Sequence, residues 1–433
     1  MTIKTQLESL LTLLSTGALA CAGCSQLEDR VEAPSETSTC YPLQMRNDLP
    51  WFGSNSTTLT TWLDSRGCEK DPSFSADPDL RPVALFDWDN TILKNDIGDA
   101  ITFHLLLHDK VLQPPSQDWT KTSGYMTAEG AAALTAACGT TVAAGKPLPT
   151  STNTACANEI LSMYVDNLTT GGAPGFAGHD YRRMEPTYAW TAQLMAGYTH
   201  AQIEQMTLDA AGPQLEAAMG TTQVVGSRTV NGWLRIYPQI VELIKLARSR
   251  GYDVWIITAS PQDVVRAVSR LAGIEPDHVI GIRSMTDAAG KLTYAFEGCG
   301  PVADGNQSLI SYIEGKRCWV NKVVFGDKTA TAMDRRRDPR QVFAAGDSDT
   351  DIEFLRDSVY KLAINRNKKE LMCFAYRNEG KSWLINPMFI EPKAKQATFY
   401  PCSTTACKAS DGSAGPCRDE SGAVIPDQAD KVF

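Results

Sequence analysis

The chain has 433 residues, of which 43% are hydrophobic, and its formal net charge at pH 7 is -9. This length and apolar content are enough for a large core, arranged as one domain with an insertion or as two domains. The acidic balance provides none of the basic surface that nucleic-acid-binding proteins usually carry, so we expect no nucleic-acid partner. Beyond the amino terminus, no apolar run of the sequence has the length of a membrane-spanning helix.

Residues 1–24 have the composition of an export signal. A single lysine, Lys4, precedes a short apolar stretch, and small residues lead up to Cys24. Glu8 lies inside the apolar stretch, so a cytoplasmic protein with a frayed amino-terminal helix is the alternative. The residues before Cys24 resemble a bacterial lipoprotein signal, in which that cysteine is acylated. We therefore expect export, either to the bacterial periplasm or cell envelope or by secretion, with a membrane contact only through a lipid anchor at Cys24.

The number of cysteines favours acylation at Cys24 over the earlier cysteine of the signal. The chain has 12 cysteines, and removing the signal with Cys24 acylated leaves an even number that can all pair. None of these lies in a C-x-x-C pair, so disulfides in an oxidising compartment are a better interpretation than zinc. Local bridges are expected between Cys138 and Cys156 and between Cys299 and Cys318, although spacing alone does not fix the connectivity.

A strand-length apolar run within residues 83–91 ends in two aspartates, Asp87 and Asp89. Residues past a strand end are extended enough to aim both carboxylates into the crevice where open α/β sheets bind ligands. Two negative charges so close together raise the pKa of at least one carboxyl unless a cation or a proton offsets them. Hard cations such as Mg²⁺ bind carboxylate and phosphate oxygens, which indicates phosphoryl chemistry. An Asp-rich turn after an ordinary strand is the alternative.

Residues 342–351 form a second strand that ends in carboxylates. Asp347 at the strand end and Asp351 one turn into the next helix can point the same way. Calcium loops also alternate aspartates, but they need a glycine at the sixth place and a glutamate at the twelfth. Ile352 and Ser358 occupy those places, so a calcium loop is disfavoured.

Residues 253–258 predict a buried strand that ends in Thr258. Ser260 then predicts a capped helix start, and a helix amino terminus beside a strand-end hydroxyl is a ready anion site. Farther on, a helical stretch begins with Lys316, whose ammonium is placed to point inward, with Lys322 as the alternative. A strand followed by a capped helix also occurs without a ligand, and a single lysine at a helix start is usually a solvated charge.

Two further groups lie in the alanine-rich, helix-rich residues 95–233. His104 and His108 share one helix face, but no third zinc-type ligand follows, so an ordinary helix face is favoured. Several aromatic residues surround Arg182 and Arg183. Aromatic residues at helical spacing are typical of a core, although a cage for a quaternary ammonium uses the same residue types. These aromatic residues are Phe176, Tyr181, Tyr188, Trp190 and Tyr198.

The strand-end groups occur in a distinctive order: Asp-x-Asp-x-Thr from Asp87, a strand-end Thr258, a lysine, and Gly-Asp-Ser-x-x-Asp from Gly346. This order resembles the haloacid dehalogenase superfamily, in its phosphatase branch, over residues 84–365. The helical insertion between the first two motifs is similar to the cap of the phosphoserine phosphatase subgroup. Residues 186–194, together with the export signal, look like the phosphorylcholine phosphatases.

The resemblance implies a role for each matching residue. Asp87 would attack phosphorus and form an aspartyl phosphate. Asp89 would protonate the leaving alcohol and later activate water. Thr258, Ser260 and Lys316 would bind the phosphate oxygens and stabilise the charge that develops on them.

The resemblance also implies Mg²⁺ as cofactor. The ion would be held by the carboxylates of Asp87 and Asp347 and by the backbone carbonyl of Asp89. Asp351 would either support the metal ligands or orient the phosphate-binding lysine. Thr350 stands where an Asn is common in relatives, so the hydrogen bonds around the metal ligands there depart from the family pattern.

The sequence therefore predicts an α/β fold, a Rossmann-like parallel sheet flanked by helices, with an inserted helical cap. Its expected function is Mg²⁺-dependent hydrolysis of small phosphomonoesters, with phosphocholine as a candidate substrate. A phosphotransferase of the same fold and a non-catalytic surface-binding lipoprotein are the alternatives. The predicted divisions after the signal are a polar linker at 25–50, a catalytic core at 51–94 and 234–397, a helical cap at 95–233, and a Cys-containing tail at 398–433.

Overall fold

The structure is a computed structural model, and it describes residues 40–68, 80–336 and 338–433. The predicted signal with Cys24, and the predicted linker up to residue 39, lie outside the described residues. Within the described ranges, no helix is both long enough and apolar enough to cross a membrane.

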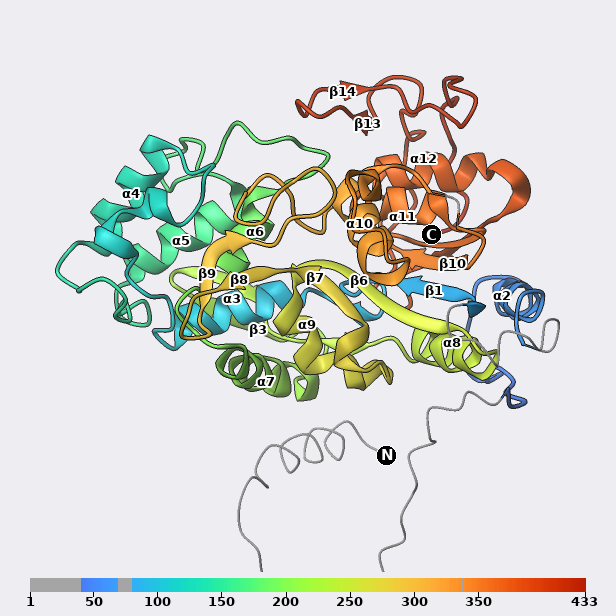
Figure 1. Ribbon diagram of the computed structural model, residues 1–433, viewed down its shortest axis with the longest axis horizontal. Coiled ribbons are helices and arrows are strands. Elements are labelled where there is room, and N and C mark those ends of the chain that lie inside the picture. The colour runs from blue at the N-terminus through green and yellow to red at the C-terminus, as the bar shows by residue number, and fades with distance from the viewer. Residues whose placement is uncertain (1–39, 69–79, 337) are drawn as a thin grey trace, which may run out of the picture.

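The centre of the molecule is a six-stranded, fully parallel sheet with the strand order β12-β11-β10-β1-β6-β7 (Figure 1). Strand β1 lies between β6 and β10, and its last residue, Phe86, is opposite Ile256 and Ala345. The predicted α/β fold with a Rossmann-like sheet is therefore confirmed. The strands are β1 (Val83–Phe86), β6 (Asp253–Pro261), β7 (Val279–Ile282), β10 (Gln341–Gly346), β11 (Tyr360–Asn365) and β12 (Trp383–Pro387).

Alternate residues of the strands belong to two separate hydrophobic clusters. Phe86 and Phe343 join one cluster, whereas their neighbours Leu85 and Ala344 join the other. Successive side chains of a strand point to opposite faces of the sheet, so each face carries its own cluster, and only α6 of the helices named below contributes residues to both. The first cluster includes residues of α2 (Asn55–Asp64), α3 (Ile97–Leu107), α7 (His200–Glu216), α8 (Pro238–Ser249) and α9 (Gln262–Val268); the second includes residues of α6 (Pro186–Gln193), α10 (Glu314–Trp319), α11 (Ile352–Asp357) and α12 (Lys369–Arg377).

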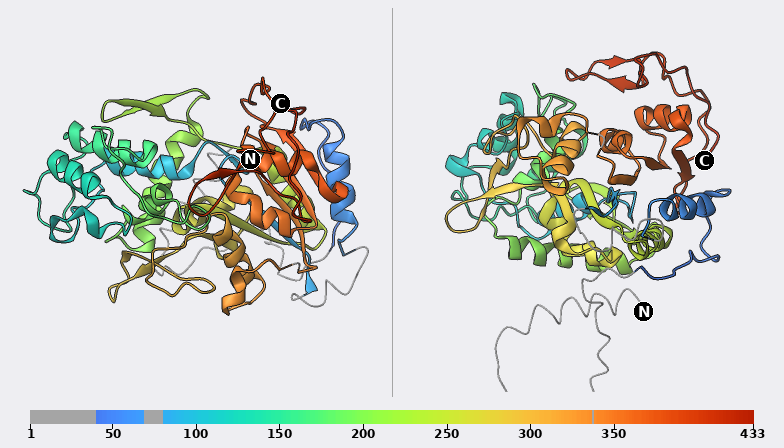
Figure 2. Two further views of the ribbon diagram at one scale, coloured as in Figure 1. Left: turned by 90° about the horizontal axis from the view of Figure 1, so that it is seen from above. Right: turned by 45° about the vertical axis from the view of Figure 1, so that its right-hand side comes forward.

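The predicted helical insertion lies beside one end of the sheet (Figure 2). Where the chain enters and leaves it, β2 (Leu93–Lys94) and β5 (Arg235–Ile236) pair antiparallel. Between them lie α3, α4 (Ala128–Cys138), α5 (Thr154–Asp166), α6 and α7. They are followed by a hairpin, β3 (Thr222–Val225) and β4 (Arg228–Asn231), which the sequence does not indicate because its residues are mostly polar and partly exposed.

All ten cysteines of the described residues form disulfides. The predicted bridges Cys138–Cys156 and Cys299–Cys318 are confirmed. The other three are Cys40–Cys68, Cys373–Cys402 and Cys407–Cys417. The last two hold the carboxy-terminal tail, which contains the short antiparallel strands β13 (Cys407–Lys408) and β14 (Ala414–Gly415).

The expected helix cap at Ser260 is wrong. Strand β6 continues through Ser260 to Pro261 because Pro261 still pairs with Ile282 of β7. Helix α9 begins at Gln262 without a side-chain cap. The Ser260 hydroxyl is therefore free to make a different contact, described below.

Candidate active site

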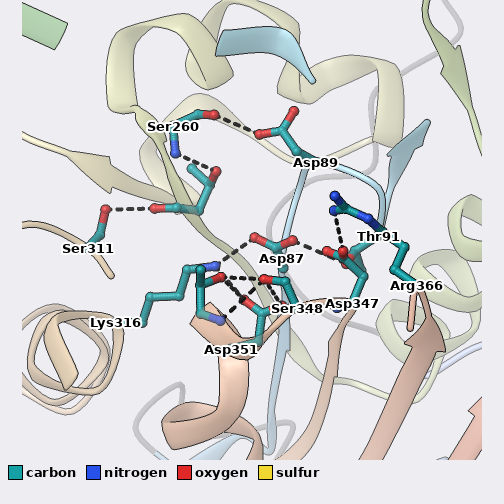
Figure 3. A network of polar contacts seen from close by, with 12 residues as sticks. Asp87, Asp89, Thr91, Ser260, Ser311, Lys316, Asp347, Ser348, Asp351 and Arg366 are labelled. Atoms are coloured by element: carbon teal, nitrogen blue, oxygen red, sulfur yellow. Dashed lines mark hydrogen bonds and ion pairs between the residues drawn. The ribbon is translucent and has the colours of Figure 1, made fainter. Parts of the chain in front are cut away.

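The candidate site lies at the carboxyl ends of the central strands, between β1 and β10. The sheet order changes direction there, since the chain builds β6 and β7 on one side of β1 and β10 to β12 on the other. Open parallel sheets bind ligands at such a switch point. Asp87 directly follows β1 and Asp347 directly follows β10, so the pairing of these strands brings together two carboxylates that are distant in sequence (Figure 3).

A buried lysine joins two of the carboxylates. The Lys316 Nζ donates to Asp87 Oδ1 at 2.7 Å and to Asp351 Oδ1 at 2.6 Å. The lysine and Asp351 are fully buried, and Asp87 is 5% exposed. Burial raises the pKa of Asp87 well above its ordinary value, the nearby Asp351 adds to the rise, and the Lys316 ammonium opposes it. The ammonium therefore offsets part of the electrostatic cost of placing these acids side by side.

Close packing before the lysine explains why Lys316 points inward. A Cβ on Gly315 would lie 1.8 Å from the backbone oxygen of Ile310, so only glycine fits there without a shift. The alternative lysine, Lys322, instead donates to the backbone oxygen of Gly298 at 2.6 Å. Of the two predicted lysines, the structure brings Lys316 to the carboxylates and directs Lys322 elsewhere.

Asp347 contacts Thr91, which it shares with Asp87, and Arg366. The Thr91 hydroxyl lies 3.2 Å from Asp87 Oδ2 and 3.2 Å from Asp347 Oδ1. A hydroxyl has one hydrogen to donate, so it serves one of these oxygens at a time. Arg366 Nη1 donates to Asp347 Oδ2 at 2.5 Å. The sequence patterns do not identify Arg366 as a site residue. Its position directly after β11, at the same edge of the sheet as Asp347, is the feature that could have indicated it.

Asp351 fixes the loop after β10. Its Oδ2 accepts hydrogen bonds from the backbone amides of Asp347 and Ser348, both at 3.0 Å. A carboxylate that accepts two amide hydrogen bonds orients the chain around it. Asp351 therefore holds both Lys316 and the residue that carries the neighbouring carboxylate.

The Asp89 carboxyl stands apart from this group. Its Oδ1 accepts from the Ile97 amide and its Oδ2 from the Ser260 hydroxyl, both at 2.7 Å. Burial raises the pKa of Asp89 well above its ordinary value, and the nearby carboxylate of Asp96 adds to the rise. The protonated form of Asp89 is therefore favoured more than that of an ordinary aspartate, which suits a general acid.

Thr258 belongs to the same wall of the site. It is buried in β6, its hydroxyl accepts from the Ser260 amide at 3.0 Å, and its backbone oxygen accepts from the Ser311 hydroxyl at 2.6 Å. These contacts fix the side chain beside the cavity of about 140 Å³ that it lines together with Asp87, Asp89 and Ser260.

The carboxylates fit a hard divalent cation. Asp87, Asp347 and Asp351 each offer an oxygen atom, and these atoms all lie within 4.8 Å of one another. The two cations that contact them, Lys316 and Arg366, leave this group with a net negative charge when all five are ionised. An all-oxygen donor set with surplus negative charge is what Mg²⁺ requires. Asp351 is already held by the lysine and two amides, so Asp87 and Asp347 are the better ligands.

Four tyrosines form the outer wall of the cavity. Tyr181 and Tyr188 come from the insertion and both lie edge-to-face with Tyr312, with ring centroids 6.0 Å and 5.9 Å away. Tyr164 donates to Asp99 Oδ1 at 2.7 Å. The acid Asp96 also lines the cavity, so its outer part combines aromatic rings with negative charge.

The other predicted aromatic residues lie elsewhere. Phe176 and Trp190 are buried against each other inside the insertion, with ring centroids 5.3 Å apart. Tyr198 donates to the backbone oxygen of Lys110. The rings of His104 and His108 lie 4.4 Å apart, and burial lowers the pKa of His104 to about 4. In the described ranges, the metal-ligand group found is the aspartate group above and does not include these histidines.

Comparisons with known proteins agree with this fold. A family model described as haloacid dehalogenase-like hydrolase matches residues 173–356. No curated protein matches the chain significantly. Among solved structures, a conserved protein of unknown function from Anaerococcus prevotii is 18% identical, with a TM-score of 0.55, over 78% of this chain and 92% of that chain.

Two other solved structures are more distant. A protein of unknown function from Bordetella pertussis is 15% identical over 70% of this chain and 97% of that chain, with a TM-score of 0.41. A phosphoserine phosphohydrolase-like protein from Francisella tularensis is 12% identical over 66% of this chain and 87% of that chain, with a TM-score of 0.31.

Asp99, which accepts the hydrogen bond from Tyr164 of the wall, predicts a pH-dependent stability. Burial raises the pKa of Asp99 to about 7, with a further rise from Asp96. An unfolded aspartate ionises near pH ~4, so the folded state holds this proton more tightly and stability falls as pH rises from about 4 to about 7. The Asp99→Asn variant should lose this part of the fall. Urea unfolding with EDTA present, at about pH 5 and about pH 7.5, gives the change in the free energy of unfolding with pH for wild type and for Asp99→Asn.

Asp209→Asn, on the exposed side of α7, is the matched control and should keep the wild-type slope. Equal slopes for wild type and Asp99→Asn would contradict this interpretation of Asp99.

Proposed function

We propose that the chain is a haloacid dehalogenase-like hydrolase, as the family-model match over residues 173–356 supports, and that it acts as a Mg²⁺-dependent phosphomonoesterase through an aspartyl phosphate. The observation that carries the proposal is the arrangement of Asp87. One of its oxygens contacts the buried Lys316 ammonium, Asp347 lies beside it, and the side chain lines the cavity. A carboxylate held in this way is an oriented nucleophile.

Each step of the reaction uses a group at the cavity. Asp87 Oδ attacks phosphorus, the bond from phosphorus to the substrate's alcohol oxygen breaks, and protonated Asp89 gives its proton to that oxygen. Asp89 then accepts a proton from water as the water oxygen attacks phosphorus. The bond from phosphorus to Asp87 breaks, which releases phosphate and restores both acids.

The phosphoryl group needs positive charge and hydrogen-bond donors around it. Lys316 supplies a fixed ammonium, and the Thr258 and Ser260 hydroxyls lie on the adjoining wall. A Mg²⁺ ion held by Asp87, Asp347 and the Asp89 carbonyl would add the positive charge that keeps Asp87 ionised and stabilises the phosphoryl oxygens. Asp351 positions Lys316 and the loop of Asp347.

The outer wall supports phosphocholine as the substrate. Rings of Tyr181, Tyr188 and Tyr312 face the cavity next to the acids Asp96 and Asp349. Aromatic rings and carboxylates are the groups that bind a quaternary ammonium. The phosphate end of the substrate would lie at Asp87 and the cationic end at this wall.

A panel of phosphomonoesters tests the proposed function. With Mg²⁺, the protein should release phosphate from phosphocholine, phosphoethanolamine and phosphoserine, with the highest kcat/KM for phosphocholine because its ammonium carries no hydrogen-bond donor and suits aromatic faces. EDTA should stop release, and Mg²⁺ should restore it. Asp87→Asn should lower kcat at least about 1,000-fold, because the nucleophile is lost.

The same panel separates the alternatives. A flat substrate profile would remove phosphocholine, and unchanged turnover by Asp87→Asn would remove the aspartyl phosphate. Transfer of the phosphoryl group to added alcohols would indicate a phosphotransferase. Absence of release from every ester would favour a non-catalytic binding protein.

The two lysines of the region provide a matched pair. Lys316→Met should lower kcat about 100-fold or more, since it removes a donor aimed at the developing charge. Lys322→Met removes an ammonium that contacts a backbone oxygen elsewhere, and its kcat should stay close to that of wild type. Circular dichroism shows whether each variant keeps its fold. Equal losses for the two variants would contradict the assignment to Lys316.

We further propose that the protein is an exported lipoprotein anchored through Cys24. The sequence of the signal supports this, and five disulfides suit an oxidising compartment. After expression in a bacterial host, wild type should partition into the detergent phase and Cys24→Ser into the aqueous phase. Identical partition of the two would exclude the anchor.

A further inference from the structure

The carboxy-terminal tail is fastened to the core near the candidate site. The Cys373–Cys402 disulfide joins it to α12, and its buried residues Cys417 and Ile425 belong to the hydrophobic cluster on that face of the sheet. The Cys407–Cys417 disulfide closes the segment that contains β13 and β14. Figures 1 and 2 show this part of the tail extending above α12 toward the insertion.

The tail contacts the insertion at one residue of the cavity wall, Tyr181. The Tyr181 amide donates to the backbone oxygen of Ser410 at 2.7 Å. The Lys408 Nζ lies 4.5 Å from the centroid of the Tyr181 ring. One tail segment therefore holds both the backbone and the ring of the same tyrosine.

The neighbours of Tyr181 extend this contact along the wall. Its ring packs edge-to-face on Tyr312, which packs in the same way on Tyr188, and all three line the cavity. A ring fixed from outside by a cation, and from inside by another ring, presents a rigid surface to the cavity. Replacing Lys408 should therefore change the position of the Tyr181 ring in the outer wall. Lys408 itself does not contact the carboxylates around Lys316.

The charge of Lys408 reaches the same region. Asp349 lines the cavity, and the Lys408 ammonium interacts with it electrostatically. A positive charge behind the wall would by itself weaken binding of a cationic group, so the tail favours binding by fixing the Tyr181 ring.

We propose that residues 407–415 are part of the substrate-binding site, in which Lys408 and Ser410 are positioning residues that hold Tyr181 and so set the affinity for the organic group of the substrate. This inference rests on the proposed phosphomonoesterase function. It assigns to the tail a role in choosing the substrate, separate from phosphoryl transfer.

Lys408→Met tests the role of the ammonium, because methionine keeps much of the apolar stem and removes the charge. The KM for phosphocholine should rise about fivefold, the size expected for one partly exposed cation–π contact. The kcat and the inhibition constant of inorganic phosphate should stay within about twofold, since phosphate binds at the carboxylate end of the cavity. Lys395→Met is the matched control, because Lys395 makes the same kind of contact with the Phe433 ring, neither residue lines the cavity, and the variant should change none of these values.

The disulfide provides a second, independent test. The double substitution Cys407→Ser and Cys417→Ser should speed hydrogen exchange in peptides that contain the Tyr181 amide, because the acceptor at Ser410 loses its restraint. The corresponding double substitution at Cys138 and Cys156, inside the insertion, should leave that exchange unchanged. Exchange needs no substrate, so its result is independent of turnover.

Calorimetric binding of phosphocholine to Asp87→Asn, with and without Lys408→Met, separates the two proposals. Weaker binding in the presence of Lys408→Met, together with no turnover by wild type, would overturn the phosphatase and keep the role of the tail. Turnover with an unchanged KM for Lys408→Met, or unchanged exchange in the tail double variant, would overturn the role of the tail.

Discussion

The ion-paired Lys316 holds the candidate site together. Its ammonium has no exposed surface, and it contacts carboxylates from two different elements, Asp87 after β1 and Asp351 before α11. Moving an ammonium from water into a protein interior costs several kcal/mol, and losing one partner of a buried ion pair destabilises the fold by about 3–5 kcal/mol. Lys316, Asp87 and Asp351 are therefore stable only together. Their mutual dependence fixes the distance between the loops after β1 and β10, and with it the place where a cation and a phosphoryl group can bind.

The sheet explains why these groups meet. Parallel pairing of β1 with β10 sets the ends of the two strands side by side, and a shift of one residue would turn every side chain to the other face. The two hydrophobic clusters oppose such a shift because each contains alternate residues of the same strands. The register that buries Phe86 on one face and Leu85 on the other is therefore also the register that presents Asp87 at the edge.

Much of this could be predicted from the sequence, because the apolar strands and the acids at their ends are local patterns. The choice between Lys316 and Lys322 was not local, since it depends on the packing of Gly315 against Ile310. The expected cap at Ser260 failed for a similar reason, because the length of β6 depends on its pairing with β7. Arg366 was missed because the end of β11 carries no acidic motif that draws attention to it.

Contacts between distant segments also decide how the insertion can move. Arg182, next to Tyr181, donates to Glu353 of α11 at 2.7 Å and to Glu370 of α12 at 2.8 Å. These pairs are largely buried, so opening the insertion on this side would separate Arg182 from both carboxylates at once. Tyr188, by contrast, is 41% exposed although it lines the cavity. A swing of the whole insertion would break both the Arg182 pairs and the contact of Tyr181 with the tail.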